Sequence, residues 1–324
     1  MKRSKLIGLM GSAFVAIVAA EILLRFVLGL GNPVLFQADP KTGYRFKPDQ
    51  NITRFFRRVQ YNQYSQRSEP TTSEKPPDTF RILMTGDSIL NGRNSVDQSE
   101  TISEFLERQL ADQDNQKIEV LNASAGSWGI GNQLGYLLQF GLFESDLLIV
   151  EIGSHDLTQP TRTGEPVGRD PNFPDRKPRS ALSEAWNRYL WPRLAPQSNS
   201  TPADAEPPTR SELDAQFQDN LTSLQTIVEL AEREDIPAVV ILIPELRELT
   251  DPAYTFPRKS DFLKQLNGMN VPVIDFYRVW SGRSPELLES YFDDGLHLTP
   301  AGNRAIADEI AEKLAATDDW QPQK

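Results

Sequence analysis

The sequence contains no cysteine and only two histidines, and both scarcities restrict its possible chemistry. Without cysteine, the chain cannot form disulfides, thiolate metal sites or a lipid-modified cysteine anchor. His155 and His297 lie in separate motifs, so a zinc site with several histidine ligands is not expected. We therefore predict neither a metal nor a cofactor, and no glycine-rich phosphate loop is present either.

Basic residues are also fewer than acidic ones. The 324 residues include 34 Lys and Arg against 45 Asp and Glu, which gives a formal net charge of -11. An acidic surface repels phosphate groups instead of neutralising them. Nucleic acid is therefore excluded as an expected partner.

The N-terminus combines a basic start with a long apolar run. Lys2, Arg3 and Lys5 precede apolar residues that continue to Leu30, interrupted by Glu21 and Arg25. Residues 6–30 would form a helix about 37 Å long, which exceeds a hydrocarbon core of about 30 Å. The basic residues favour a cytoplasmic N-terminus and an extracytoplasmic remainder. We interpret residues 1–30 as a membrane anchor, and the alternative is a signal peptide cleaved near Ala20 that releases a secreted protein.

Residues 31–79 are rich in proline and show little sustained periodicity, which predicts a stalk and an irregular lead-in. A flexible tether rarely holds many aromatic residues, so we expect part of this segment to pack on the domain. The aromatic residues concerned are Tyr44, Phe46, Phe55, Phe56 and Tyr61.

From residue 80 onward, apolar runs typical of strands alternate with helical patterns. Repeated strand and helix units predict an α/β domain with a parallel sheet, which binds its ligands at the carboxyl ends of the strands. We assign this domain to residues 80–318, followed by a tail at 319–324. The predicted strands are 80–85, 118–121, 147–152, 238–243 and 271–276, and the predicted helices are 101–111, 132–140, 211–231 and one that opens at 299–301.

A proline-rich insertion, residues 158–210, interrupts this alternation. We predict a short helix around Trp186, Tyr189 and Trp191, acting as a lid, and disorder over residues 197–208, which lack large apolar groups. The three aromatic side chains could stack on a sugar, cover an acyl chain or form a small core for the insertion.

A candidate nucleophile follows the first predicted strand of the domain. Gly86-Asp87-Ser88 places the Ser88 hydroxyl at the carboxyl edge of the sheet, where it needs a base to remove its proton. His297 is the better of the two imidazoles because Asp294 lies on the same short turn and can orient it. Asp293 is a weaker alternative, since neighbouring side chains on a turn point apart.

Four segments, taken in order, resemble the SGNH, or GDSL, hydrolase family. They are Gly86-Asp87-Ser88, Asn-Ala-Ser-Ala-Gly at 122–126, Gly153-Ser154-His155-Asp156 and Asp294-Gly295-Leu296-His297. The resemblance implies a flavodoxin-like three-layer α/β/α sandwich and ester hydrolysis through an acyl-enzyme. It also implies Ser88 as nucleophile, His297 as base, Asp294 as the orienting acid, and an oxyanion hole made by the Ser88 N–H, an N–H of the second segment and a side chain of the third.

The chain departs from the family pattern in two places. The second segment continues as Gly126-Ser127, and either backbone N–H could complete the oxyanion hole. His155 stands where the family has asparagine, and we expect its imidazole to donate an N–H to the oxyanion. The alternative is that His155 only satisfies Asp156 or a backbone carbonyl, while Asp156 braces its own loop.

These features predict a membrane-tethered serine esterase, periplasmic or at the cell surface, that acts on short-chain or acetyl esters, including those of glycans. An O-acyltransferase that modifies envelope or exported polysaccharide would share every catalytic residue. A third hypothesis is an inactive binding module that retains the fold, and the main reason for it is His155 in place of asparagine.

Overall fold

The computed structural model describes residues 2–113, 117–194 and 208–316. Its centre is a sheet of five parallel strands in the order β6-β5-β7-β8-β9. This order and orientation are those of a flavodoxin-like fold. The strands are β5 (Thr79–Gly86), β6 (Lys117–Ser124), β7 (Leu147–Gly153), β8 (Ala238–Ile243) and β9 (Val273–Asp275), at the five predicted positions.

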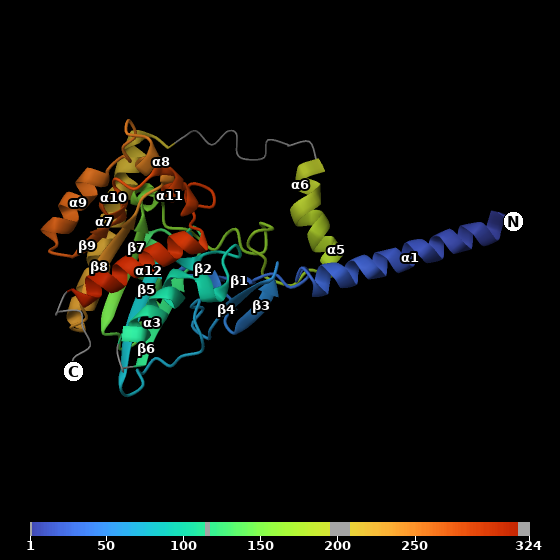
Figure 1. Ribbon diagram of the computed structural model, residues 1–324, viewed down its shortest axis with the longest axis horizontal. Helices are drawn as coiled ribbons and strands as arrows, with labels where there is room; N and C mark the ends of the chain where they lie inside the picture. The colour runs from blue at the N-terminus through green and yellow to red at the C-terminus, as the bar shows by residue number, and fades with distance from the viewer. Residues whose placement is uncertain (1, 114–116, 195–207, 317–324) are drawn as a thin grey trace.

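Helices cover both faces of the sheet, so the predicted three-layer sandwich is confirmed (Figure 1). On β5, Leu83 packs into one apolar cluster while Ile82 and Met84 pack into the other, and all three side chains are fully buried. Burial on both faces explains why these strands are continuous apolar runs. One face is covered by α4 (Ile130–Phe140), α7 (Arg210–Arg233) and α9 (Lys259–Gly268), and the other by α3 (Ile102–Gln113), α10 (Phe276–Trp280), α11 (Pro285–Ser290) and α12 (Pro300–Ala315).

The lead-in differs from the stalk and irregular segment that the sequence indicated. It forms two antiparallel hairpins, β1 (Phe36–Asp39) with β2 (Gly43–Phe46) and β3 (Gln50–Arg54) with β4 (Arg57–Tyr61). Phe46 stacks on Tyr61 with ring centroids 3.9 Å apart, and both side chains are buried. Strands of four or five residues are too short to show a clear period, but their aromatic side chains bury enough apolar surface to hold them on the domain.

The insertion contains the predicted short helix, in a longer form. α5 (Ala181–Glu184), the π-helical segment η3 (Ala185–Leu190) and α6 (Trp191–Leu194) follow one another without a break. Trp186 and Trp191 are 48% and 53% exposed, so they do not form a core for the insertion. The disorder predicted for 197–208 falls outside the described residues except at Pro208, and the predicted tail 319–324 lies wholly outside them.

The N-terminal helix α1 (Lys2–Phe26) extends away from the domain (Figure 1). Its segment Ile7–Phe26 has a mean hydropathy of 2.2 and is not buried against the protein, so it is long and apolar enough to cross a membrane. Near its end, the Glu21 carboxylate accepts hydrogen bonds from the backbone N–H groups of Ala181 and Leu182, each at 2.9 Å. These bonds attach the base of α1 to the start of α5.

Candidate active site

Ser88 is the first residue of the short helix α2 (Ser88–Asn91), directly after β5. The Asp87 carboxylate caps this helix by accepting the backbone N–H of Ile89 at 2.7 Å. A side chain at Gly86 would put its Cβ 2.4 Å from Glu151 Oε2, so only glycine fits between the strand end and that carboxyl. The sharp strand-to-helix turn therefore presents the Ser88 hydroxyl at the carboxyl edge of the sheet.

The structure brings Ser88, His297 and Asp294 together although the first and last are more than 200 residues apart in sequence. Ser88 Oγ lies 3.0 Å from His297 Nε2, and His297 Nδ1 lies 2.8 Å from Asp294 Oδ2. With a proton on Nδ1 directed at the carboxylate, Nε2 is free to accept the serine proton. The turn that carries both partners precedes α12, which Thr299 caps and Pro300 begins.

Asp294 is held as a carboxylate by its contacts with His297. Burial opposes its ionisation, but the backbone N–H and the imidazole of His297 outweigh that effect and lower the pKa of Asp294 to about 2. Asp293 does not contact the imidazole; its backbone N–H donates to the His297 carbonyl at 2.7 Å. The geometry thus favours Asp294 over Asp293 as the acid beside the base.

Arg93 is a neighbour of this pair that the sequence did not indicate. Its Nη1 lies 3.2 Å from Asp294 Oδ2 and 2.8 Å from His297 Nδ1. Nδ1 cannot both donate to Asp294 and accept from Arg93. When Nδ1 carries a proton and donates it to Asp294, Arg93 can donate only to that same carboxylate. The guanidinium therefore competes with the imidazole for Asp294. The position of Arg93 therefore affects how well Asp294 can stabilise a protonated His297.

The backbone of the second segment lies beside the nucleophile. A Cβ built at Gly126 would be 4.0 Å from Ser88 Cβ, and Ser127 adopts a left-handed conformation with φ 60°. The lead-in fixes this loop, because the Tyr44 hydroxyl donates to the Gly126 carbonyl at 2.5 Å and Trp128 Nε1 donates to the Tyr44 carbonyl at 2.8 Å. Hairpin β1–β2 is thus part of the scaffold of the site.

Comparison with known protein families identifies the family of the chain. The model of the GDSL-like lipase/acylhydrolase family matches residues 84–305. The chain belongs to this family. No curated protein sequence matches the chain.

Solved structures of several hydrolases resemble the chain at low identity. TesA is 18% identical and covers 73% of this chain and 98% of its own, with a TM-score of 0.45. An acetyl xylan esterase, AlAXEase, is 13% identical over 72% of this chain and 99% of its own, with a TM-score of 0.46. A lipase/acylhydrolase from Enterococcus faecalis is 18% identical over 76% of this chain and 99% of its own, with a TM-score of 0.44. Similarity this distant gives no information about substrate.

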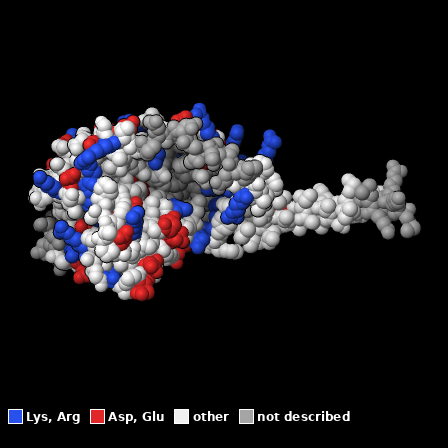
Figure 2. Space-filling view, turned by 90° about the horizontal axis from the view of Figure 1, so that it is seen from above, with Lys and Arg blue, Asp and Glu red and all other residues white. Residues whose placement is uncertain are grey.

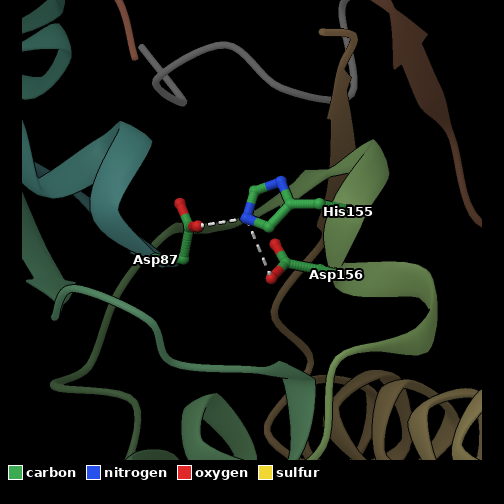
Figure 3. Close-up of side chains that lie close together, drawn as sticks. All are labelled: Asp87, His155 and Asp156. Atoms are coloured by element: carbon green, nitrogen blue, oxygen red, sulfur yellow. Dashed lines mark hydrogen bonds and ion pairs between the residues drawn. The ribbon is translucent and has the colours of Figure 1, made fainter. Parts of the chain in front are cut away.

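His155, which stands where the family has asparagine, lies beside two buried carboxyls. It lies in the 3-10 turn η2 (Ser154–Thr158) after β7, and its Nε2 lies 2.8 Å from Asp87 Oδ2 and 3.5 Å from Asp156 Oδ1 (Figure 3). The ring packs over Gly153, where a Cβ would approach its Cε1 to 2.4 Å. With Nε2 directed at Asp87, the ring braces the carboxylate that caps α2, and its buried Nδ1 has no hydrogen-bond partner among the described residues.

Asp87 and Asp156 lie beside this histidine and Glu151 lies beside Asp87, and these three buried carboxyls differ in how readily they ionise. Burial opposes ionisation of Asp87, but the hydrogen bond and positive charge of His155 outweigh it and lower the Asp87 pKa. Burial and the charge of Asp87 raise the pKa of Asp156 to about 8 and that of Glu151 well above its usual range. Burial opposes protonation of His155, but the neighbouring carboxylates prevail and raise its pKa to about 9. The surroundings therefore favour an ion pair between His155 and Asp87 and oppose ionisation of Asp156 and Glu151.

Asp87, His155 and Asp156 also place three possible metal-ligating atoms within 4.8 Å of one another. A metal would need a neutral imidazole and ionised carboxylates. The raised pKa of His155 and of Asp156 opposes both requirements. The donor set thus fits a hydrogen-bonded ion pair better than a metal centre.

A cavity of about 720 Å³ opens beside Ser88 and His297. The lead-in hairpins supply Phe36, Phe46 and Tyr61, and the insertion supplies Phe173 and Tyr189. The sequence did not indicate that the lead-in residues line the cavity, because their contribution depends on packing between distant segments. The insertion does border the site, as expected for a lid, but Trp186 and Trp191 are not among the residues that line the cavity.

Proposed function

We propose that the protein is a serine esterase that hydrolyses acyl esters through an acyl-enzyme at Ser88. The observation that carries the proposal is the 3.0 Å contact between Ser88 Oγ and His297 Nε2, with Asp294 directly behind the imidazole. A general base at this distance can accept the serine proton as the hydroxyl attacks the ester carbonyl.

The proposed mechanism passes protons through one imidazole in both acylation and deacylation. His297 takes the proton from Ser88 during attack, and the Asp294 carboxylate stabilises the imidazolium. His297 then gives the proton to the departing alcohol, which leaves Ser88 acylated. Water, activated by the same imidazole, attacks the acyl-enzyme and restores the free hydroxyl.

We assign the oxyanion hole to the backbone N–H groups of Ser88 and Gly126, with Ser127 as the alternative second donor. The Ser88 N–H is at the first position of α2, where the helix itself provides no acceptor. The closeness of Gly126 to Ser88 favours the glycine over Ser127. His155 then acts on Asp87, which caps the helix that carries the nucleophile.

The test of this function is turnover of acyl esters by the full chain in detergent, with acyl groups of graded length and with acetylated glycans. Ser88→Ala should reduce turnover to the uncatalysed rate. The control is Ser223→Ala, because Ser223 is half-buried on α7 and its hydroxyl donates to the Asp219 carbonyl one turn earlier. If Ser88→Ala keeps wild-type turnover, the proposal is wrong. Acyl transfer to a sugar hydroxyl in excess of hydrolysis would instead identify an acyltransferase.

We also propose that α1 anchors the enzyme in a membrane with the domain outside the cytoplasm. Trp186, Leu190, Trp191 and Leu194 are 47–66% exposed and lie on the insertion helix beside the base of α1. In Figure 1 this helix starts beside the base of α1 and leaves it at a steep angle, as expected for a helix at the bilayer surface, where tryptophan is enriched. Basic side chains flank the junction of α1 with the domain in Figure 2, where they can attract anionic headgroups.

Membrane fractionation and N-terminal sequencing of the mature protein test this location. An anchor predicts a full-length chain that stays in the membrane fraction at high salt and alkaline pH. A mature N-terminus just after Ala20 would show instead that the segment is a cleaved signal peptide.

A further inference from the structure

The cavity beside Ser88 is basic, although the protein as a whole is acidic. Three arginines line it, together with His297, and none of its lining residues among the described part of the chain is Asp or Glu. The whole chain carries a formal net charge of -11. A concentration of positive charge around a nucleophile, against such a background, indicates an anionic ligand. The three arginines are Arg57, Arg93 and Arg188.

These guanidinium groups are incompletely neutralised. Within the described residues, the exposed Arg57 side chain has no ion pair or hydrogen bond. Arg188 Nη1 is 3.9 Å from Glu184 Oε1, but Glu184 is already paired with Arg54 at 2.6 Å. Arg93 shares Asp294 with His297. Positive charge is thus available to a ligand from both the lead-in and the insertion.

The remaining lining residues indicate what carries the anion. The walls combine aromatic rings, such as Phe46 and Tyr189, with the side-chain amides of Asn94 and Asn172. Rings that stack and amides that hydrogen-bond hydroxyls suit a sugar. A guanidinium recognises the two oxygens of a carboxylate through paired N–H groups, which an ammonium cannot do.

We propose that the cavity selects acyl esters of acidic sugars, in which a ring carboxylate binds Arg57 and Arg188 while the ester carbonyl meets Ser88. This inference rests on the proposed esterase function and specifies its substrate class.

The test compares two probes that differ only at the sugar C6, a mono-O-acetyl methyl glucuronoside and the corresponding mono-O-acetyl methyl glucoside. For the full chain in a neutral detergent at low salt, kcat/KM should be about tenfold or more higher for the acidic probe. In about 1 M salt, where the screening length is about 3 Å, this ratio should decrease severalfold. Anionic lysophospholipid is the third probe.

Substitutions identify the residues responsible. Arg57→Gln with Arg188→Gln should reduce the ratio about tenfold, and Arg57→Glu should invert the preference. Arg233→Gln, an exposed arginine at the end of α7, is the matched control and should leave the ratio unchanged. Thermal unfolding of each variant shows that the fold is kept, and Arg57 has no described contact whose loss would unfold the chain.

The possible failures are distinguishable. Equal turnover of both sugars, or turnover only of a simple acetate ester, overturns the acidic-sugar proposal and leaves the esterase function standing. Preference for lysophospholipid over both sugars overturns it in favour of a lipid substrate. Loss of turnover on every ester, including the simple acetate, would contradict the esterase function itself.

Discussion

The ion pair between His155 and Asp87 should make the free energy of unfolding depend on pH. The pKa of His155 is raised from its usual 6.5 to about 9 in the folded protein. At 1.36 kcal/mol per pKa unit, this shift corresponds to about 3 kcal/mol. Because the folded-state pKa is the higher one, this stabilisation is fully present below pH 6.5 and is lost as pH rises through 9.

We expect His155→Gln to unfold at lower urea concentration than the wild type near pH 6, and the difference to shrink as pH rises. The free energies of unfolding of the two proteins should differ by about 3 kcal/mol more at pH 6 than at pH 10. Comparison at each pH subtracts the contributions of titrating groups that do not interact with His155, whereas Asp87 and Asp156 titrate together with it. A difference that stays constant across this range would mean that His155 contributes packing alone.

Imidazole NMR gives a second, independent measurement. The chain has only two histidines, so His297→Gln leaves a single set of ring signals, which belong to His155. Its titration should be centred near pH 9. A midpoint at or below 6.5 would refute the ion pair and return His155 to a neutral role.

Three further predictions concern other parts of the site. Asp294→Asn should lower kcat about 10³-fold or more in steady-state assays, since the amide no longer fixes the productive tautomer of the base; an unchanged kcat would remove this carboxylate from the mechanism. Gly153→Ala should lower both activity and melting temperature, because the new Cβ would lie 2.4 Å from an imidazole carbon, whereas Gly268→Ala, which meets nothing within 4 Å, should not. Glu184→Gln should lower the free energy of unfolding by about 3–5 kcal/mol, because it leaves the buried Arg54 without its ion pair. The exposed Glu165→Gln should lower it by only about 0–1 kcal/mol. Equal effects of the two substitutions on urea unfolding would contradict this prediction.

The sheet and the order of the motifs could be predicted because both depend on local pattern. The strands of the sheet are buried on both faces and therefore appear as apolar runs, and the residues at 86–88 and 294–297 each follow or precede a regular element. Parallel topology then places such loops at one edge of the sheet. The contact of Ser88 with His297 follows from that topology.

Other parts of the site depend on packing between distant segments. Asp156 adjoins His155 in sequence, yet the closer partner of the imidazole is Asp87, from another strand end. Arg93 reaches Asp294 from a loop in which its own backbone is left-handed, with φ 54°. The two hairpins of the lead-in form separate two-stranded sheets, whose strands are too short for periodicity to reveal.

The central claim is that His297 activates Ser88 as a nucleophile, and covalent labelling tests it most directly. A fluorophosphonate should modify the wild-type chain once, with the adduct mapped to Ser88 by mass spectrometry, and His297→Ala should label at least about 10²-fold more slowly. Ester turnover that continues while Ser88 remains unlabelled, or an adduct on a different residue, would contradict the account.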